Sequence, residues 1–169
     1  LNTRVIKLNN SQYQVRVCSY NSDVKVHEYK GISFSVVYGE FSNFMYKLCD
    51  YLEKAIPYAA NEHQKQMLVE YVKHFRSGDI DAHKDAQRSW IKDKGPIVET
   101  NIGFIEVYLD PARVRAEYEG FVAVVDKENS KKLANLVEGA EEIIKNLPWG
   151  SNFEKEKFSK PDFTSLNVL

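Results

Sequence analysis

The chain has 169 residues, of which 43% are hydrophobic and 28% are charged, and its formal net charge is -1. This composition is typical of a folded globular protein and excludes a disordered one. A chain of this length can bury a substantial core as one domain. The near-neutral charge argues against a nucleic-acid partner, and no apolar run approaches the roughly 18 residues of a membrane span. We therefore expect a single domain, residues 1–169, in the cytoplasm and without a membrane partner.

Two cysteines, Cys18 and Cys49, fall in different predicted elements and lack C-x-x-C spacing. We expect both to be buried free thiols, because this spacing fits neither a disulfide framework nor a thiolate zinc site. The chain opens at Leu1 without an initiator Met and stops at Leu169 inside a strand-like run. Both ends look cut, so we expect a piece of a longer polypeptide.

The first 40 residues alternate between apolar and polar side chains, as β-strands do. Residues 3–8 and 12–20 are joined by a short Asn- and Ser-containing turn and predict a hairpin. The alternation continues over residues 24–38 with a break at Gly31, which predicts one or two further strands.

From Phe41 the apolar residues recur at helical spacing. Two amphipathic helices are predicted on either side of Pro57, the second capped at Asn61 and ended by Gly78. Asp79 can cap a third, less regular helix. These three helices should supply most of the apolar surface that covers the sheet.

Two strands follow, at about residues 97–109 and 115–125, joined by a turn at Asp110-Pro111. The next helix begins after Asp126 and is ended by Pro148, and the regular spacing of its apolar residues predicts a buried face.

Residues 149–162 are irregular, and residues 163–169 resemble the start of a strand. The element order lacks the regular alternation of a doubly wound sheet. The predicted fold class is α+β, with a small, largely antiparallel β-sheet or barrel and flanking α-helices.

No catalytic or metal-binding motif emerges from the residues. A helical zinc site of the H-E-x-x-H type needs two His one turn apart, and His27-Glu28 has no second His at that spacing. The other histidines, His63, His74 and His83, are eleven and nine positions apart, which indicates surface or cap positions. We find no G-x-S-x-G elbow and no Gly-rich phosphate loop, so no catalytic residue and no metal ligand is predicted in this chain.

The predicted hairpin is unusually rich in carboxylates. Side chains alternate faces along a strand, so Glu106 and Tyr108 should project together, and the return strand should bring residues near Tyr118 and Glu119 opposite them. Two such carboxylates could bind a cation such as a peptide ammonium, share a proton as an acid-base pair, or remain solvated charges that discourage aggregation. The carboxylates concerned are Glu99, Glu106, Asp110, Glu117 and Glu119.

The residues alone leave two functions open. One is a non-enzymatic interaction module whose exposed sheet edge receives an extended peptide strand. The other is a hydrolase that uses a carboxylate pair without metal, which would remain active in the presence of a chelator.

Segments along nearly the whole chain resemble the dipeptidyl peptidase III family, in the same order. The most specific are ETNIGFIEVY at residues 99–108 and EYEGFVAVV at residues 117–125, and the first 40 residues match least. Further matching segments lie at residues 58–61, 63–64, 66–68, 82–84, 90–91, 93–99, 147–149, 153–155 and 161–166.

The resemblance implies a cytosolic zinc exopeptidase that removes dipeptides from the N-terminus of short peptides. In that family a cleft separates an upper helical lobe, which holds zinc, from a lower lobe that contains a small β-barrel. This chain resembles the central part of the lower lobe, and the family's zinc motif lies beyond it. The implied partners are short peptides and the upper zinc-binding lobe of the same polypeptide. We expect the isolated chain to bind no catalytic zinc and to hydrolyse nothing.

The resemblance also assigns expected roles to four residues. Glu106 matches the glutamate that holds the substrate's ammonium, and Tyr108 matches a tyrosine that hydrogen-bonds the substrate near the scissile bond. Glu119 and Phe163 match positions that line the cleft and its N-terminal-side pockets. The segment Leu109–Arg115 departs from the family's Arg-Asp-Pro pattern, which leaves the shape of the neighbouring subsites open.

Overall fold

The computed structural model describes residues 1–161 and 163–169, so Asp162 of the predicted irregular stretch is outside the described range. The chain divides into two compact units. The first comprises Leu1–Lys94 and Asn101–Gly120, and the second comprises Gly95–Thr100 and Phe121–Leu169. The expectation that all 169 residues act as one domain of a larger lobe stays a prediction.

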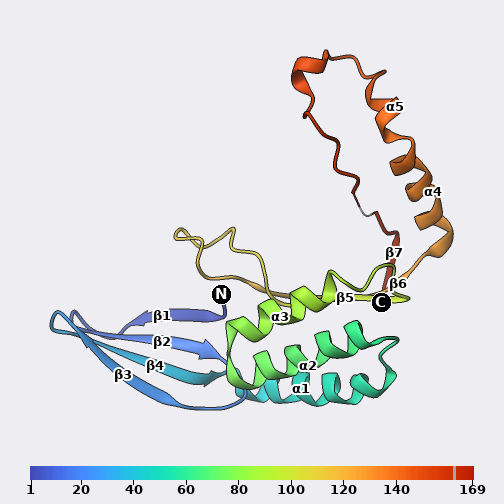
Figure 1. The fold of residues 1–169 in the computed structure, drawn as a ribbon. Coiled ribbons are helices and arrows are strands. Elements are labelled where there is room, and N and C mark those ends of the chain that lie inside the picture. The colour runs from blue at the N-terminus through green and yellow to red at the C-terminus, as the bar shows by residue number, and fades with distance from the viewer. Residues whose placement is uncertain (162) are drawn as a thin grey trace. The chain divides into compact units, whose positions relative to one another are not determined.

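A four-stranded sheet occupies the N-terminal part of the first unit. Its strands are β1 (Thr3–Lys7), β2 (Gln12–Cys18), β3 (Val24–Tyr29) and β4 (Ile32–Glu40). They lie in the order β1-β2-β4-β3 (Figure 1), with antiparallel outer pairs and a parallel central pair. The predicted break at Gly31 is confirmed: Lys30 and Gly31 have φ values of 51° and 75°, which suit a tight hairpin turn.

Three helices follow, and Figure 1 shows them side by side. They are α1 (Ser42–Ala55), α2 (Glu62–Ser77) and α3 (Ile80–Trp90), with the short 3₁₀ helix η1 (Ile56–Tyr58) at Pro57. The predicted caps are confirmed, because the Asn61 side chain accepts the Gln64 N–H at 2.9 Å and the Asp79 side chain accepts the Asp81 N–H at 2.9 Å. Each bond satisfies one amide of a helical first turn.

The core of the first unit lies between these helices and the end of β5 (Val98–Phe104). Tyr71 is fully buried, and its hydroxyl accepts the side-chain amide of Gln87 at 3.1 Å. Cys18 and Cys49 are free and buried, as predicted, and burial raises the pKa of the Cys18 thiol to about 12. The buried cluster consists of Cys18, Met45, Cys49, Leu52, Met67, Leu68, Tyr71, Val72, Phe75 and Ala86.

A second sheet has the order β5-β6-β7, where β6 is Tyr118–Val125 and β7 is Leu166–Val168. β7 pairs antiparallel with β6, and it confirms the strand predicted within residues 163–169. Strands predicted at 97–109 and 115–125 were too long on the hairpin side, because β5 ends at Phe104 and β6 begins at Tyr118.

The second unit contains α4 (Lys127–Glu138), α5 (Ala140–Ile144) and the 3₁₀ turn η2 (Ser151–Phe153). Asp126 caps α4 by accepting the Asn129 N–H, while the Asp126 N–H donates to the Ser165 carbonyl at 2.9 Å. One continuous helix to Pro148 was predicted, and this was wrong, since Gly139 interrupts it. Glycine is a weak helix former, which favours an interruption at this position.

The predicted buried face of this helix was also wrong in large part. Val137 is the single buried residue of α4 and α5 within the described range, whereas Leu136 is 51% exposed and Ile143 is 46% exposed. An apolar face is buried only where another surface of the fold covers it.

The α+β fold class is confirmed. The described residues form two open sheets that are mainly antiparallel, with helices beside them and no closed barrel. Within the same residues, no helix combines the length and apolarity that a bilayer crossing requires.

Candidate functional site

Glu106, Tyr108 and Glu119 belong to the first unit, and they lie where the β5–β6 hairpin departs from regular pairing. Glu106 and Tyr108 follow the end of β5, and Glu119 is the second residue of β6. Phe163 belongs to the second unit, where it is 50% exposed and precedes β7. The structure therefore brings three of the four expected site residues to one hairpin.

The strands stop because the register becomes irregular beyond Phe104. The Ile105 N–H donates to the Glu117 carbonyl at 3.2 Å, and the Glu117 N–H donates to the Glu106 carbonyl at 2.8 Å. Two consecutive residues thus face one residue, which is the pattern of a β-bulge and redirects the side chains that follow. Glu106 consequently has Glu117 as its backbone partner, the residue directly before the Tyr118 and Glu119 that were predicted near it.

Despite this irregularity, Glu106 and Tyr108 interact directly. A hydrogen bond from the Tyr108 hydroxyl to the Glu106 carboxylate raises the pKa of the tyrosine, and the negative charge of Glu119 adds to the effect. Tyr108 is 78% exposed, whereas Glu106 is half-buried. This arrangement presents a carboxylate, a phenol and a second nearby negative charge at an accessible surface, which suits recognition of a cation with hydrogen-bond donors.

The connecting loop is held by Asp110. Its carboxylate accepts the backbone N–H groups of Val114 and Arg115, each at 2.7 Å, and that of Ala112 at 3.3 Å. These bonds, led by the one from Arg115, lower the pKa of Asp110. The Arg113 N–H also donates to the Asp110 carbonyl at 2.9 Å, which closes the turn predicted at this position. The loop has a defined shape although its sequence departs from the family pattern.

Aromatic side chains form an apolar cavity of about 410 Å³ beside the hairpin. The rings of Phe104 and Tyr118 meet edge to face, with centroids 5.4 Å apart. The sequence did not predict this cavity, because its lining comes from segments far apart in the chain. Phe41 and Phe44, which line it, are 57% and 68% exposed. The lining residues are Cys18, Phe41, Phe44, Met45, Leu48, Phe104 and Tyr118.

Two imidazoles are buried beneath β5, whereas surface or cap positions were predicted for these histidines. His74 is 1% exposed and His83 is 6% exposed, and their ring centroids are 5.2 Å apart. Burial lowers the pKa of His74 to about 4, and the pKa of His83 is lowered for the same reason. Position 103 lies over these rings and has room only for glycine, because a Cβ there would lie 2.9 Å from a ring carbon of His83.

These histidines do not form a zinc site. His74 Nδ1 is 2.7 Å from the Asp79 carbonyl oxygen, so this nitrogen carries the proton and donates. No group of three or more His, Cys, Asp or Glu side chains that could hold a metal ion occurs in the described part of the chain. Zinc sites in proteins, structural or catalytic, hold the ion through at least three protein ligands. The described residues do not offer such a set.

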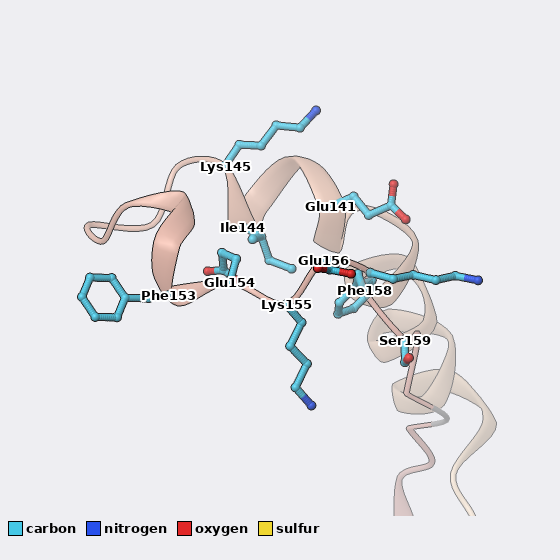
Figure 2. A pocket seen from close by; sticks show the side chains of 10 residues that line it. Glu141, Ile144, Lys145, Phe153, Glu154, Lys155, Glu156, Phe158 and Ser159 are labelled. Atoms are coloured by element: carbon cyan, nitrogen blue, oxygen red, sulfur yellow. The ribbon is translucent and has the colours of Figure 1, made fainter.

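The second unit has a separate hollow of about 810 Å³ between α5 and the segment after η2 (Figure 2). Lys145, Phe153 and Lys155 project outward from it, while Ile144 and Phe158 lie toward its centre. Three lysines and three glutamates share the lining, so the hollow has no preference for one sign of charge. It contains none of the four expected site residues. The charged lining residues are Glu141, Lys145, Glu154, Lys155, Glu156 and Lys157.

Comparison with solved structures supports the fold. Dipeptidyl peptidase III of Caldithrix abyssi matches 88% of this chain with a TM-score of 0.66 and 23% sequence identity, over 28% of its own length. The enzyme from Corallococcus sp. strain EGB matches 89% of the chain with a TM-score of 0.55. At this identity the likeness concerns the fold alone.

Comparison of sequences goes further. The chain is 49% identical over 170 residues to dipeptidyl peptidase 3 of Dictyostelium discoideum and 48% identical over 183 residues to that of Homo sapiens, each covering 99% of this chain. It spans 25% of the length of either relative. The model of peptidase family M49 matches residues 1–169 in full. The chain therefore belongs to peptidase family M49.

Proposed function

We propose that this chain is the substrate-binding part of a zinc-dependent dipeptidyl peptidase, which releases dipeptides from the N-terminus of short peptides in the cytoplasm. The relatives at about half identity are named dipeptidyl peptidase 3, and this chain covers a quarter of their length. The observation that carries the proposal is the cluster of Glu106, Tyr108 and Glu119 at one accessible end of a hairpin.

The cluster suits a peptide that begins with a free amine. The half-buried Glu106 carboxylate would pair with the ammonium, in a charge-assisted bond that is stronger than a neutral one. The Tyr108 phenol, already oriented by Glu106, would hydrogen-bond the peptide backbone. Glu119 adds negative potential. A fixed ammonium site also acts as an end-stop, which selects the bond that is cut at a set distance from the N-terminus.

Bond cleavage belongs elsewhere in the polypeptide. Zinc chemistry in a peptidase needs a set of His and carboxylate ligands, and the described residues do not supply one. We propose that an upper lobe of the same polypeptide supplies the zinc, and that the 169 residues alone bind no catalytic zinc and hydrolyse nothing.

The test is Glu106→Gln in a longer polypeptide that carries this chain and the zinc lobe. Loss of a charge-assisted bond of about 1.5–3 kcal/mol should lower kcat/KM for free-amine peptides by roughly 10- to 100-fold. Bound zinc, measured by atomic absorption, should not change. Glu62→Gln removes an exposed carboxylate from the first turn of α2 and serves as the matched control. Wild-type kinetics in Glu106→Gln would sink the assignment.

A second candidate function is an interaction module that binds peptides at a sheet edge. β3 is an edge strand, and all six of its residues are exposed, including Val24, Val26 and Tyr29. An extended peptide could pair with such an edge through main-chain hydrogen bonds. Titration of the 169-residue chain with short peptides by calorimetry separates the two functions. Tight binding that survives Glu106→Gln favours the module, whereas a divided enzyme cleft predicts weak binding or none.

A further inference from the structure

A small cavity of about 260 Å³ lies in the first unit beside the hairpin, and arginines dominate its lining. Arg4 comes from β1, Arg16 from β2, and Arg115 from the loop before β6. We call this cavity, with the three arginines, the arginine pocket. No local pattern in the sequence indicates it, because the three residues are separated by up to 111 positions and the sheet and loop bring them together.

The pocket has more cationic than anionic groups. Glu40 pairs with Arg4 and lies 3.9 Å from an Arg16 nitrogen, and its side chain is only 10% exposed. A second carboxylate, that of Asp110 outside the lining, lies 3.7 Å from an Arg115 nitrogen. Asp110 is already occupied by three backbone N–H groups of its own loop. Three guanidinium groups therefore face two carboxylates that are already engaged.

One donor in the pocket lacks a partner. The Nε of Arg115 is buried and has no hydrogen-bond acceptor among the residues that the structure describes. A buried donor without an acceptor costs about 1–3 kcal/mol, so its presence calls for an explanation, and a bound acceptor is one. The free face of a guanidinium is a planar fork that fits the two oxygens of a carboxylate.

The rest of the lining fits a short aliphatic stem. Cys18, Phe41 and Phe104 form an apolar wall, and the same three residues line the apolar cavity described above. The volume is below the usual range for a whole small-molecule ligand, and it suits one side chain or one chain end. A methylene stem against Phe104 would place its carboxylate among the arginines.

The pocket borders the expected ammonium site. Ala116 lines it and directly precedes Glu117, whose N–H donates to the Glu106 carbonyl at 2.8 Å. On the other strand, Phe104 lines it and lies two residues before Glu106. A ligand with an ammonium at Glu106 and a nearby carboxylate would therefore meet opposite charges at neighbouring positions of one hairpin.

We propose that the arginine pocket binds a carboxylate of a peptide ligand, so that the protein prefers peptides with an acidic group close to the amine. The identification of the ligand as a peptide rests on the proposed function, whereas binding of a carboxylate does not. The carboxylate can belong to an Asp or Glu side chain or to the C-terminus of a very short peptide. Both sources share the chemistry of a bidentate pair with Arg115.

The test uses the ¹⁵N-labelled 169-residue chain and the arginine Nε–H signals in a ¹H–¹⁵N spectrum. Three probes are titrated at constant ionic strength. N-acetylglutamate methylamide has only a side-chain carboxylate, N-acetylglycine has only a terminal one, and N-acetylglutamine methylamide has none. We expect a saturable shift of the Arg115 signal with N-acetylglutamate methylamide or with N-acetylglycine. The probe that binds more tightly identifies whether the pocket takes a side-chain or a terminal carboxylate. Equal shifts with the uncharged probe, or no saturable shift with either carboxylate, would overturn the proposal.

Variants locate the binding. Arg115→Gln should weaken carboxylate binding by roughly 10-fold or more, the loss expected for a charge-assisted pair. Because Arg115 also contacts the loop at Asp110, Arg4→Gln on β1 provides a second variant outside the loop, followed through the Arg115 signal. Arg113→Gln, an exposed arginine of the same loop that does not line the pocket, is the matched control and should bind as the wild type does. Wild-type affinity in both pocket variants would contradict the proposal.

The same titration distinguishes this proposal from the proposed function. Glu106→Gln should leave binding of the acetylated probes unchanged, because they have no amine. If Glu106→Gln does not alter peptidase kinetics while Arg115→Gln abolishes carboxylate binding, the proposed function fails and the arginine pocket stands. The opposite pair of results removes the pocket alone.

Discussion

Helices α2 and α4 begin alike and end differently. Each is amphipathic, has an Asn or Asp cap whose side chain accepts an amide of the first turn, and is followed by a glycine. Seven residues of α2 are buried, whereas Val137 is the single buried residue of α4 in the described structure. Figure 1 shows α2 between its neighbours α1 and α3 within the first unit.

The glycines show the same difference at the level of the backbone. Gly78 after α2 is left-handed, with φ 77°, and a Cβ there would lie 2.7 Å from a methyl of Val17. The carbonyls of Phe75 and Arg76 accept N–H groups of Tyr20 and Asn21, each at 2.8 Å. The end of α2 is thus fixed by tertiary contacts. Gly139 after α4 is right-handed, with φ -83°, and its Cβ position has only ordinary contacts.

The largest expected effect concerns acid and the buried end of α2. His74 has a folded pKa of about 4, mainly because burial disfavours its charged form, against an ordinary value of 6.5. The unfolded state therefore binds the proton more readily. Stability is complete above about pH 6.5 and falls as the pH drops toward 4, by about 2–3 kcal/mol. Urea unfolding at a series of pH values measures this slope.

The comparison with α4 supplies the control for that prediction. Hydrogen-exchange protection factors, which correct for the intrinsic rate at each pH, should fall at pH 4.5 more in α2 than in α4, since the described part of α4 contains no histidine. His63→Gln, which removes an exposed imidazole from the first turn of α2, should keep the steep pH dependence. An unchanged unfolding free energy between pH 7 and pH 4.5 would show that protonation of His74 does not oppose folding.

A smaller loss is expected from Gly78→Ala. A left-handed conformation costs an L-residue about 1–2 kcal/mol, and the contact with Val17 adds to this loss. Gly31→Ala is the matched control, because Gly31 has nearly the same φ, 75°, with nothing within 4 Å of its Cβ position. Urea unfolding of both variants isolates the contribution of the contact. Equal losses in the two would mean that the end of α2 accommodates a methyl group.

The contrast between α2 and α4 also shows which features of the fold the sequence could predict. Local signals sufficed for the caps at Asn61 and Asp79, the glycine after α2 and the turn at Asp110, because each depends on a few neighbouring residues. Apolar periodicity predicted helices in both units. It could not predict burial, which depends on the surfaces that meet the helix, and it gave the same answer for Leu68, which is buried, as for Leu136, which is exposed.

The candidate site also has features that local spacing predicts and features that depend on the tertiary fold. The spacing along one strand was enough to associate Glu106 with Tyr108. It could not predict the β-bulge at Ile105, which changes how the two strands pair beyond Phe104. The buried imidazoles of His74 and His83 and the arginine pocket arise from residues far apart in the chain. No local pattern indicates them, because only the tertiary fold decides which side chains become neighbours.

The smallest expected effect has the opposite sign and tests the other end of the comparison. Gly139 has a helical φ, and the nearest atoms to its Cβ position are the Asn135 carbonyl oxygen at 3.6 Å and an Ile143 methyl at 3.9 Å. Alanine fits there without strain and reduces the freedom of the unfolded chain, so Gly139→Ala should stabilise the second unit by about 0.5–1 kcal/mol. Hydrogen exchange of the amides in α4 and α5 should slow together, because the substitution lets the two helices propagate as one. Faster exchange there would mean that contacts of the second unit require the interruption at Gly139. Gly139 would then be fixed by tertiary contacts, as Gly78 is.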